Sequence, residues 1–217
     1  THTGETDETV TINPADFLTE EEKGTYVIPQ TVQYTVSAED GGTVYLSYAR
    51  KRYSLTYNLN AEDAHWVSDP GVGHYRLGAA LKLLTQSYMM RAGYTFGGWY
   101  TDAGCTTAFT ATTMPAKDLT LYAKWTAQGG ISYTVEHYQQ NVTDDDYTLA
   151  DSESKTGTAG QNTAAESKSY TGFTAQNFQQ KIIEGNGSTV VQVYYTRNEY
   201  TLTYNLNGND AVWTDDE

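Results

Sequence analysis

Apolar and polar residues alternate along many short stretches of this 217-residue chain. The clearest stretch is Leu119–Trp125, where every second residue is apolar, as in a β-strand that buries one face. Glycine, proline, asparagine, aspartate and threonine separate such stretches and mark turns. Strands are therefore predicted at Val10–Ile12, Tyr26–Ile28, Thr31–Val36, Thr43–Tyr48, Tyr53–Leu59, Tyr94–Tyr100, Leu119–Trp125, Ile131–Tyr138, Tyr147–Lys155 and Val190–Tyr195.

A few stretches depart from this alternation and predict helix. Between Leu77 and Tyr88 the leucines recur at helical spacing, and Gly93 follows where a helix C-terminus prefers glycine. Single helical turns are predicted within Asp16–Lys23 and Gln161–Glu166. The predicted fold class is α+β, rich in strands.

The chain contains an internal repeat. Tyr53–Asn60 returns almost unchanged as Tyr200–Asn207, at an offset of 147 residues. The same offset relates residues on both sides of this match: Val44, Tyr48, Arg50, Asp63, Ala64 and Trp66 correspond to Val191, Tyr195, Arg197, Asp210, Ala211 and Trp213. Two kinds of unit therefore alternate along the chain.

These matches predict the domain boundaries. A type-one unit spans 53–127, and a type-two unit spans 131–199 after the short linker Ala127–Gly130. Residues 1–52 are expected to be a partial or divergent type-two unit, and 200–217 the start of another type-one unit. We expect the chain to be a segment of a longer protein.

The type-one unit resembles the internalin B-repeat family, also called the Listeria–Bacteroides repeat. The resemblance is carried by Gly93–Asp102, Cys105–Phe109 and Thr113–Trp125, whose glycines and tryptophans stand at specific spacings. It implies a small β-grasp (ubiquitin-like) module that recurs in extracellular proteins of the bacterial surface. It implies a spacer or adhesive role and no catalytic residues.

The type-two unit resembles the repeat of mucin-binding proteins. The residues that carry this likeness are Tyr133–Tyr138, Thr156, Gly157, Gly160, Tyr170–Phe173 and Val191–Thr196. Together the two resemblances imply tandem β-grasp modules in an elongated array on the surface of Gram-positive bacteria.

Charge and composition narrow the possible partners. The net charge of −14 argues against nucleic acid and against electrostatic binding to an anionic membrane. No apolar run approaches the length of about 18 residues that a membrane helix needs. The single cysteine, Cys105, cannot form an internal disulfide and is expected to be structural. We expect an extracellular monomer on the cell surface or in the cell wall.

No sequence motif predicts catalysis, a cofactor or a metal. Phosphate-binding glycine loops, zinc motifs and nucleophile elbows are absent from the sequence. Asp144–Asp146 lacks the spacing of a calcium loop and is interpreted as a solvated hairpin tip. An isopeptide bond between a lysine and an asparagine or aspartate beside an acid stays open, because the sequence does not identify the three residues. We expect the protein not to be an enzyme.

Three non-catalytic roles remain. In the first, successive units form a stalk or spacer. In the second, exposed aromatics bind a host mucin, another surface protein or a glycan. In the third, an exposed sheet edge pairs with another chain. The candidate binding residues are Trp66, Tyr75, Tyr100 and Trp213. For Trp66 and Trp213 the favoured interpretation is that they cover the end of the sheet or pack at the junction between modules.

Overall fold

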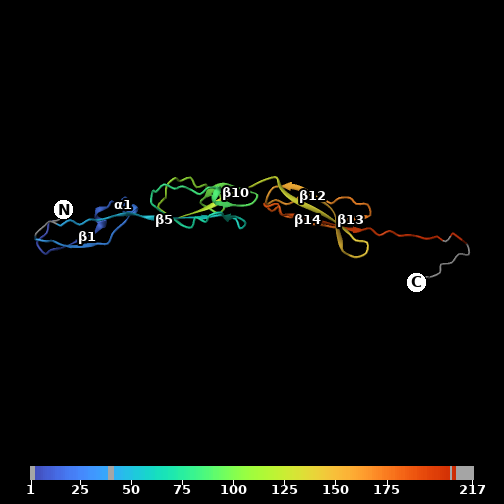
Figure 1. Cartoon of the computed structure of the whole chain (residues 1–217). Helices are drawn as coiled ribbons and strands as arrows, with labels where there is room; N and C mark the ends of the chain where they lie inside the picture. The colour runs from blue at the N-terminus through green and yellow to red at the C-terminus, as the bar shows by residue number, and fades with distance from the viewer. Residues whose placement is uncertain (1–2, 39–41, 206, 209–217) are drawn as a thin grey trace. The chain divides into compact units, whose positions relative to one another are not determined.

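The computed structural model describes residues 3–38, 42–205 and 207–208. The chain divides into two compact parts, Thr1–Thr126 and Ala127–Glu217, and each is treated by itself. Figure 1 colours the chain from blue at the N-terminus to red at the C-terminus. Strands predominate over helices in both parts, which confirms the strand-rich prediction. Among the described residues, no helix is long and apolar enough to cross a membrane.

The N-terminal segment forms two short antiparallel strand pairs. Its strands are β1 (Thr9–Ile12), which pairs with β3 (Val32–Thr35), and β2 (Tyr26–Val27), which pairs with β4 (Ala49–Arg50).

The helical turn predicted within Asp16–Lys23 is confirmed, and the helical residues divide into two elements. They are the 3-10 helix η1 (Pro14–Phe17) and the α-helix α1 (Glu20–Thr25). The boundary lies at Thr19, because its side chain and that of Glu22 form a capping box that starts α1.

The strand predicted at Thr43–Tyr48 is wrong. None of these residues belongs to a sheet within the described chain, and pairing begins only at Ala49. The alternation itself is preserved, since Val44, Leu46 and Tyr48 are half-buried while the residues between them are exposed. The sequence pattern reports which side chains are covered, whereas a strand also needs a neighbouring backbone.

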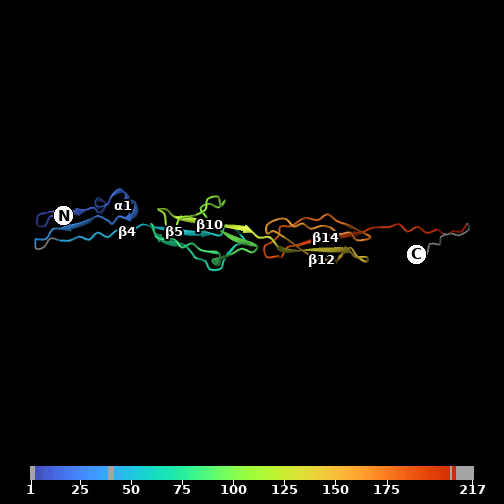
Figure 2. The ribbon, with the colours of Figure 1, turned by 90° about the horizontal axis from the view of Figure 1, so that it is seen from above.

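The type-one unit contains a four-stranded mixed sheet in the order β7-β5-β10-β9. Its strands are β5 (Arg52–Asn58), β7 (Gly73–Arg76), β9 (Tyr94–Tyr100) and β10 (Leu119–Ala127). β5 pairs antiparallel with β7 and parallel with β10, with Leu55 opposite Leu119. A separate pair joins β6 (His65–Trp66) to β8 (Met89–Met90). Figure 2 shows this part of the chain in green from above.

The core of this unit lies on one face of the sheet. Within β10 the predicted inward residues Leu119, Leu121 and Ala123 are buried, while Thr120 and Lys124 are exposed. The prediction from alternation is thus confirmed for this strand. The buried cluster consists of Leu55, Met89, Trp99, Met114, Leu119, Leu121 and Ala123.

The helix predicted between Leu77 and Tyr88 is wrong. This segment runs mainly extended and ends in the short 3-10 helix η2 (Gln86–Tyr88). Its backbone bonds to another loop: Gly78 N–H donates to Met114 O at 2.9 Å, and Leu81 N–H donates to Thr112 O at 2.8 Å. Three leucines of the segment, Leu81, Leu83 and Leu84, still pack against the core.

The type-two unit contains a second four-stranded sheet, in the order β12-β11-β14-β13. Its strands are β11 (Ile131–Gln140), β12 (Tyr147–Gly157), β13 (Phe173–Ala175) and β14 (Val190–Arg197). β11 is antiparallel to β12 and parallel to β14, and β13 is antiparallel to β14. The helical turn predicted at Gln161–Glu166 is wrong, since these residues are not helical. The buried cluster consists of Tyr133, Val135, Ala165, Ile183, Val191, Val193 and Tyr195.

Candidate functional site

Trp66 faces the core of the type-one unit. It pairs with the buried Met89 across the β6–β8 ladder, and its half-buried side chain packs against the core cluster. One side of Trp66 also lines a shallow hollow of about 610 Å³ beside residues 57–62. Most of the indole is therefore engaged in packing.

The opposite face of the β6–β8 pair is exposed and mainly apolar, with His65 opposite Met90. Val67 N–H donates to Tyr88 O at 2.9 Å, which continues the ladder by one position. Because side chains alternate, Val67, Tyr88 and Met90 point away from Trp66 and Met89. Their exposed fractions are 60%, 42% and 51%. The sequence prediction missed this outward face, which is called the Val67–Tyr88–Met90 face.

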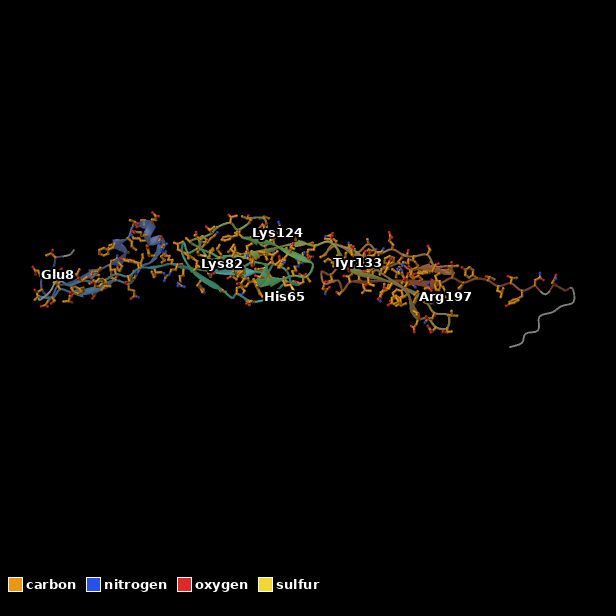
Figure 3. The ribbon with its side chains drawn as sticks, turned by 45° about the horizontal axis from the view of Figure 1, so that its top comes forward. Glu8, His65, Lys82, Lys124, Tyr133 and Arg197 are labelled. Atoms are coloured by element: carbon orange, nitrogen blue, oxygen red, sulfur yellow. The ribbon has the colours of Figure 1, made fainter. Side chains whose placement is uncertain are left out.

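Tyr75 and Tyr100 lie at opposite edges of the type-one sheet. Tyr75 is on β7, opposite Tyr53, and packs against the core cluster. Tyr100 ends β9, where Lys124 Nζ lies 5.1 Å from its ring centre in a cation–π contact. Figure 3 labels Lys124. Two strands separate β7 from β9, so Tyr75 and Tyr100 do not form one platform. Trp213 lies outside the described residues.

The tryptophans of the predicted motif hold connecting segments onto the sheet. Trp99 Nε1 donates to Leu84 O at 2.8 Å, and Trp125 Nε1 donates to Leu59 O at 2.7 Å. Phe96 lies edge-on to both indoles, with ring centres 5.1 and 6.1 Å away. These residues thus bury aromatic area while pairing their polar atoms.

Cys105 belongs to a structural turn. The carboxylate of Asp102 accepts the N–H groups of Thr106 and Thr107, which lowers the pKa of Asp102. Cys105 has a left-handed backbone with φ of 51°, and its Sγ lies 3.6 Å from Ala123 O. The side-chain amide of Asn60 also lies beside the sulfur. A thiol nucleophile needs an adjacent base, and this setting supplies amide and carbonyl groups.

A polar network lies in the core of the type-two unit. His137 on β11 is fully buried, with Nδ1 2.8 Å from Tyr195 Oη. Tyr195 Oη also accepts the backbone N–H of Lys168 at 2.7 Å. His137 Nε2 faces Glu153 Oε1 at 3.5 Å, so in the neutral ring the proton belongs on Nε2 and Tyr195 donates to Nδ1.

This network fastens the crossover between β12 and β13 to the sheet. Tyr170 of the crossover meets Tyr195 edge-on, with ring centres 4.9 Å apart. Burial raises the pKa of both tyrosines, which keeps their hydroxyls neutral. Because His137 has no exposed surface, we interpret the network as part of the core.

Lys168 joins two carboxylates at the rim of this network. Its Nζ lies 2.6 Å from Asp151 Oδ2 and 3.7 Å from Glu153 Oε2. Partial burial opposes ionisation of Glu153, but the charges of Lys155 and Lys168 and the nearby His137 lower its pKa. The hydrogen bond also raises the pKa of Lys168 and lowers that of Asp151.

Lys168, Asp151 and Glu153 are the residue types that an isopeptide bond would need. Condensation requires a neutral amine and a protonated acid, whereas the pKa shifts favour the charged forms of Lys168 and Asp151. All three side chains are partly exposed to solvent. The arrangement therefore favours an ion pair.

The acidic stretch at Asp144–Asp146 closes the hairpin between β11 and β12. Asp144 Oδ1 accepts Asn141 Nδ2 at 2.6 Å and Asp146 N–H at 3.0 Å. Within the described part of the chain, no group of three His, Cys, Asp or Glu side chains is arranged to hold a metal ion.

Comparison with known families identifies one segment. Residues 53–124 match the Listeria-Bacteroides repeat domain, a repeat found in bacterial surface proteins. This match confirms the family predicted for the type-one unit, and it includes β9 and most of β5 and β10. Residues 1–52 and 125–217 lie outside the match. No curated protein matches the chain.

Proposed function

We propose that this chain is a non-catalytic repeat region of a bacterial surface protein and that its units act as spacers outside the cell. Both units are proposed to be variants of the β-grasp, and the type-two unit to be a relative of the mucin-binding repeat. The two sheets have the same order of strands, which supports this relationship. In each sheet the first and the last long strand of the unit lie side by side at the centre. The crossover helix of a β-grasp is replaced here by extended chain.

The observation that carries the spacer role is the direction of these central strands. β5 and β10 run parallel in the type-one unit, and β11 and β14 run parallel in the type-two unit. The chain therefore enters each sheet at one end and leaves it at the other. At the usual rise per strand residue, each unit moves the chain forward by about 35 Å. An antiparallel pair would return the chain to its starting end.

Small-angle X-ray scattering of chains with one, two and three copies of residues 53–199 tests this proposal. We expect the maximum dimension to grow by a constant increment, on the order of 70 Å for each two-unit copy. As a control, Ala127–Gly130 would be replaced by a flexible Gly/Ser linker of about 20 residues, which should broaden the distance distribution. Dimensions that grow much less than linearly in the unmodified chains would refute the spacer role.

A second candidate role is adhesion to a host mucin or another glycan. It is supported by the exposed Val67–Tyr88–Met90 face, since apolar and aromatic side chains exposed together are typical of binding surfaces. Trp66, Tyr75 and Tyr100 are weaker candidates, because the first two pack against the core and the third lies under Lys124. A panel of immobilised mucin and glycans, applied to the purified chain, distinguishes adhesion from a purely mechanical role.

A further inference from the structure

The first and last long strands of each unit respond to tension in a way that their direction determines. β11 pairs parallel with β14 in the type-two unit, and β5 pairs parallel with β10 in the type-one unit. When the two ends of a unit are pulled apart, its first strand is drawn one way along the strand axis and its last strand the other way. The hydrogen bonds between the two strands are then loaded together, in shear. An antiparallel pair pulled from one end would lose its bonds one after another.

The parallel pair of the type-two unit is continuous and long. Residues 134–139 of β11 stand opposite residues 190–195 of β14. Arg197 extends the pair at its end, because its Nε donates to Gln140 O at 2.8 Å and its backbone N–H donates to Gln140 Oε1 at 3.0 Å. Sliding one strand past the other therefore requires these bonds to break almost together.

Side chains cover this parallel pair on both faces of the sheet. On the core face Val135, Val191 and Val193 are at most 1% exposed. On the outer face Tyr138 and Tyr194 stand opposite each other, and their rings stack with centres 5.2 Å apart. Water that reaches a strained hydrogen bond can replace one of its partners, so this cover opposes the loss of single bonds. The tyrosine stack joins the same two strands that carry the ends of the unit.

The type-one unit has the same arrangement in a shorter form. Residues 55–58 of β5 stand opposite residues 119–122 of β10. Before this ladder, Ser54 N–H donates to Asp118 Oδ1 at 2.7 Å, and beyond it lies the indole hydrogen bond of Trp125. A tryptophan of the predicted motif thus helps to fasten the last strand to the first.

We propose that the parallel pairs β5–β10 and β11–β14 are mechanical clamps, which keep each unit folded while the chain is under tension. The inference rests on the proposed spacer role, because a spacer carries any force between the cell and what its far end holds. It also goes beyond that role, since a rod can project a domain without resisting force.

Force spectroscopy on the full chain, with two alternative pairs of attachment points, tests the proposal on the longer clamp. In a Cys105→Ser background, Ser132→Cys with Glu199→Cys places handles that load β11 and β14 in shear. Ser132→Cys with Thr156→Cys, kept reduced, places handles that peel β12 from β11, because these two residues stand opposite each other in the antiparallel ladder. The three handle positions are exposed. Both pairs load the type-two unit alone.

The shear attachment should need at least twofold more force than the peeling attachment at the same loading rate. Forced unfolding is governed by the unfolding rate rather than by equilibrium stability. Urea midpoints of the two cysteine variants, measured without force, should agree, so that the difference in force reports geometry. The released chain identifies each event, at roughly 200 Å for the shear pair and roughly 80 Å for the peeling pair.

Equal forces for the two attachments would overturn the clamp. This outcome is separate from failure of the spacer role, which the scattering dimensions of the one-, two- and three-copy chains report. Linear growth of those dimensions together with equal forces would leave a spacer without a clamp.

Two substitutions on the outer face test the tyrosine stack. Tyr138→Ala removes a ring that joins β11 to β14, and should raise the unfolding rate under shear roughly fivefold, the usual worth of an aromatic pair. Leu149→Ala is the matched control, since Leu149 stands opposite Tyr138 on the same face but belongs to β12. It should leave that rate unchanged. An equal effect of the two substitutions would overturn the role of the stack.

Discussion

Replacing Tyr195 by phenylalanine tests whether the buried network holds the type-two unit together. The change removes one oxygen and leaves the ring, which can still meet Tyr170 edge-on. Two groups lose their partner: Nδ1 of the fully buried His137 and the backbone N–H of Lys168. Their bonds to the hydroxyl are 2.8 and 2.7 Å long, so neither is marginal.

The expected cost follows from these two orphaned groups. A buried polar group without a partner costs about 1–3 kcal/mol, and the part-buried N–H of Lys168 belongs at the low end of that range, so the free energy of unfolding should fall by roughly 2–4 kcal/mol. With a urea m-value of about 1 kcal/mol/M for a small unit, the midpoint should fall by roughly 2–4 M. Amide cross-peaks of Val193 and Leu121 in urea titrations separate the type-two unit from the type-one unit. Only the unfolding midpoint reported by Val193 should fall.

Tyr194→Phe is the matched control for this prediction. Tyr194 is the neighbouring residue on β14, but its hydroxyl bonds to the exposed side chain of Gln192 at 3.3 Å. Water can replace that partner, so the control should change the free energy of unfolding by less than about 0.5 kcal/mol. If the Tyr195 and Tyr194 variants unfold at the same urea concentration, the network does not stabilise the unit as argued.

Three further predictions concern charge, covalent state and binding. The hydrogen bond to Lys168 lowers the pKa of Asp151, so the stability that it contributes is present above the unfolded pKa of about 4 and is lost as the pH falls through the folded pKa. The Asp151→Asn variant should therefore lose less stability than the unchanged chain between pH 6 and 2.5, as measured by urea titrations. Intact-mass spectrometry should give the mass of the unmodified chain, and a deficit of one water would show a Lys168–Asp151 amide. If the chain binds a glycan, Val67→Ser and Tyr88→Ser should abolish binding, whereas Trp66→Ala should lower the thermal midpoint; binding lost only in the Trp66 variant would contradict this assignment.

The strands could be predicted because a strand that buries one face has apolar and polar residues in alternation. Leu119, Leu121 and Ala123 are buried as their alternation indicates. The Gly-Gly-Trp motif also pointed to a packed aromatic strand, and Trp99 is 5% exposed. The predictions worked where one face of one strand decides the pattern.

The helix failed because spacing alone does not identify the hydrogen-bond partner. Leucines between Leu77 and Tyr88 meet the core from an extended segment whose N–H groups reach residues 112 and 114. Those loop residues lie about 30 positions away in sequence, so no local window contains them. Helix propensity is a weak preference that such tertiary pairing overrides.

The candidate binding face could be located only through pairing. The sequence offers Trp66 as a candidate exposed aromatic, but the β6–β8 register turns it inward beside Met89. The same register turns Val67 and Tyr88 outward, although they are distant in sequence and show no common pattern. The His137 network was invisible for the same reason, since Tyr195 stands 58 residues further along the chain.

The exposed edges of the sheets in this chain are protected in several ways. Exposed strand edges invite pairing with other chains unless they are short, charged or covered. β7 and β13 have four and three residues, β12 carries Asp151, Glu153 and Lys155, and β9 is covered through Phe109 N–H, which donates to Trp99 O at 2.9 Å.

Thr43–Tyr48 has none of these protections. It contains no charged residue, and its alternate apolar side chains line an open groove. In β14, which corresponds to it, the same kind of sequence is safe because β11 lies against it.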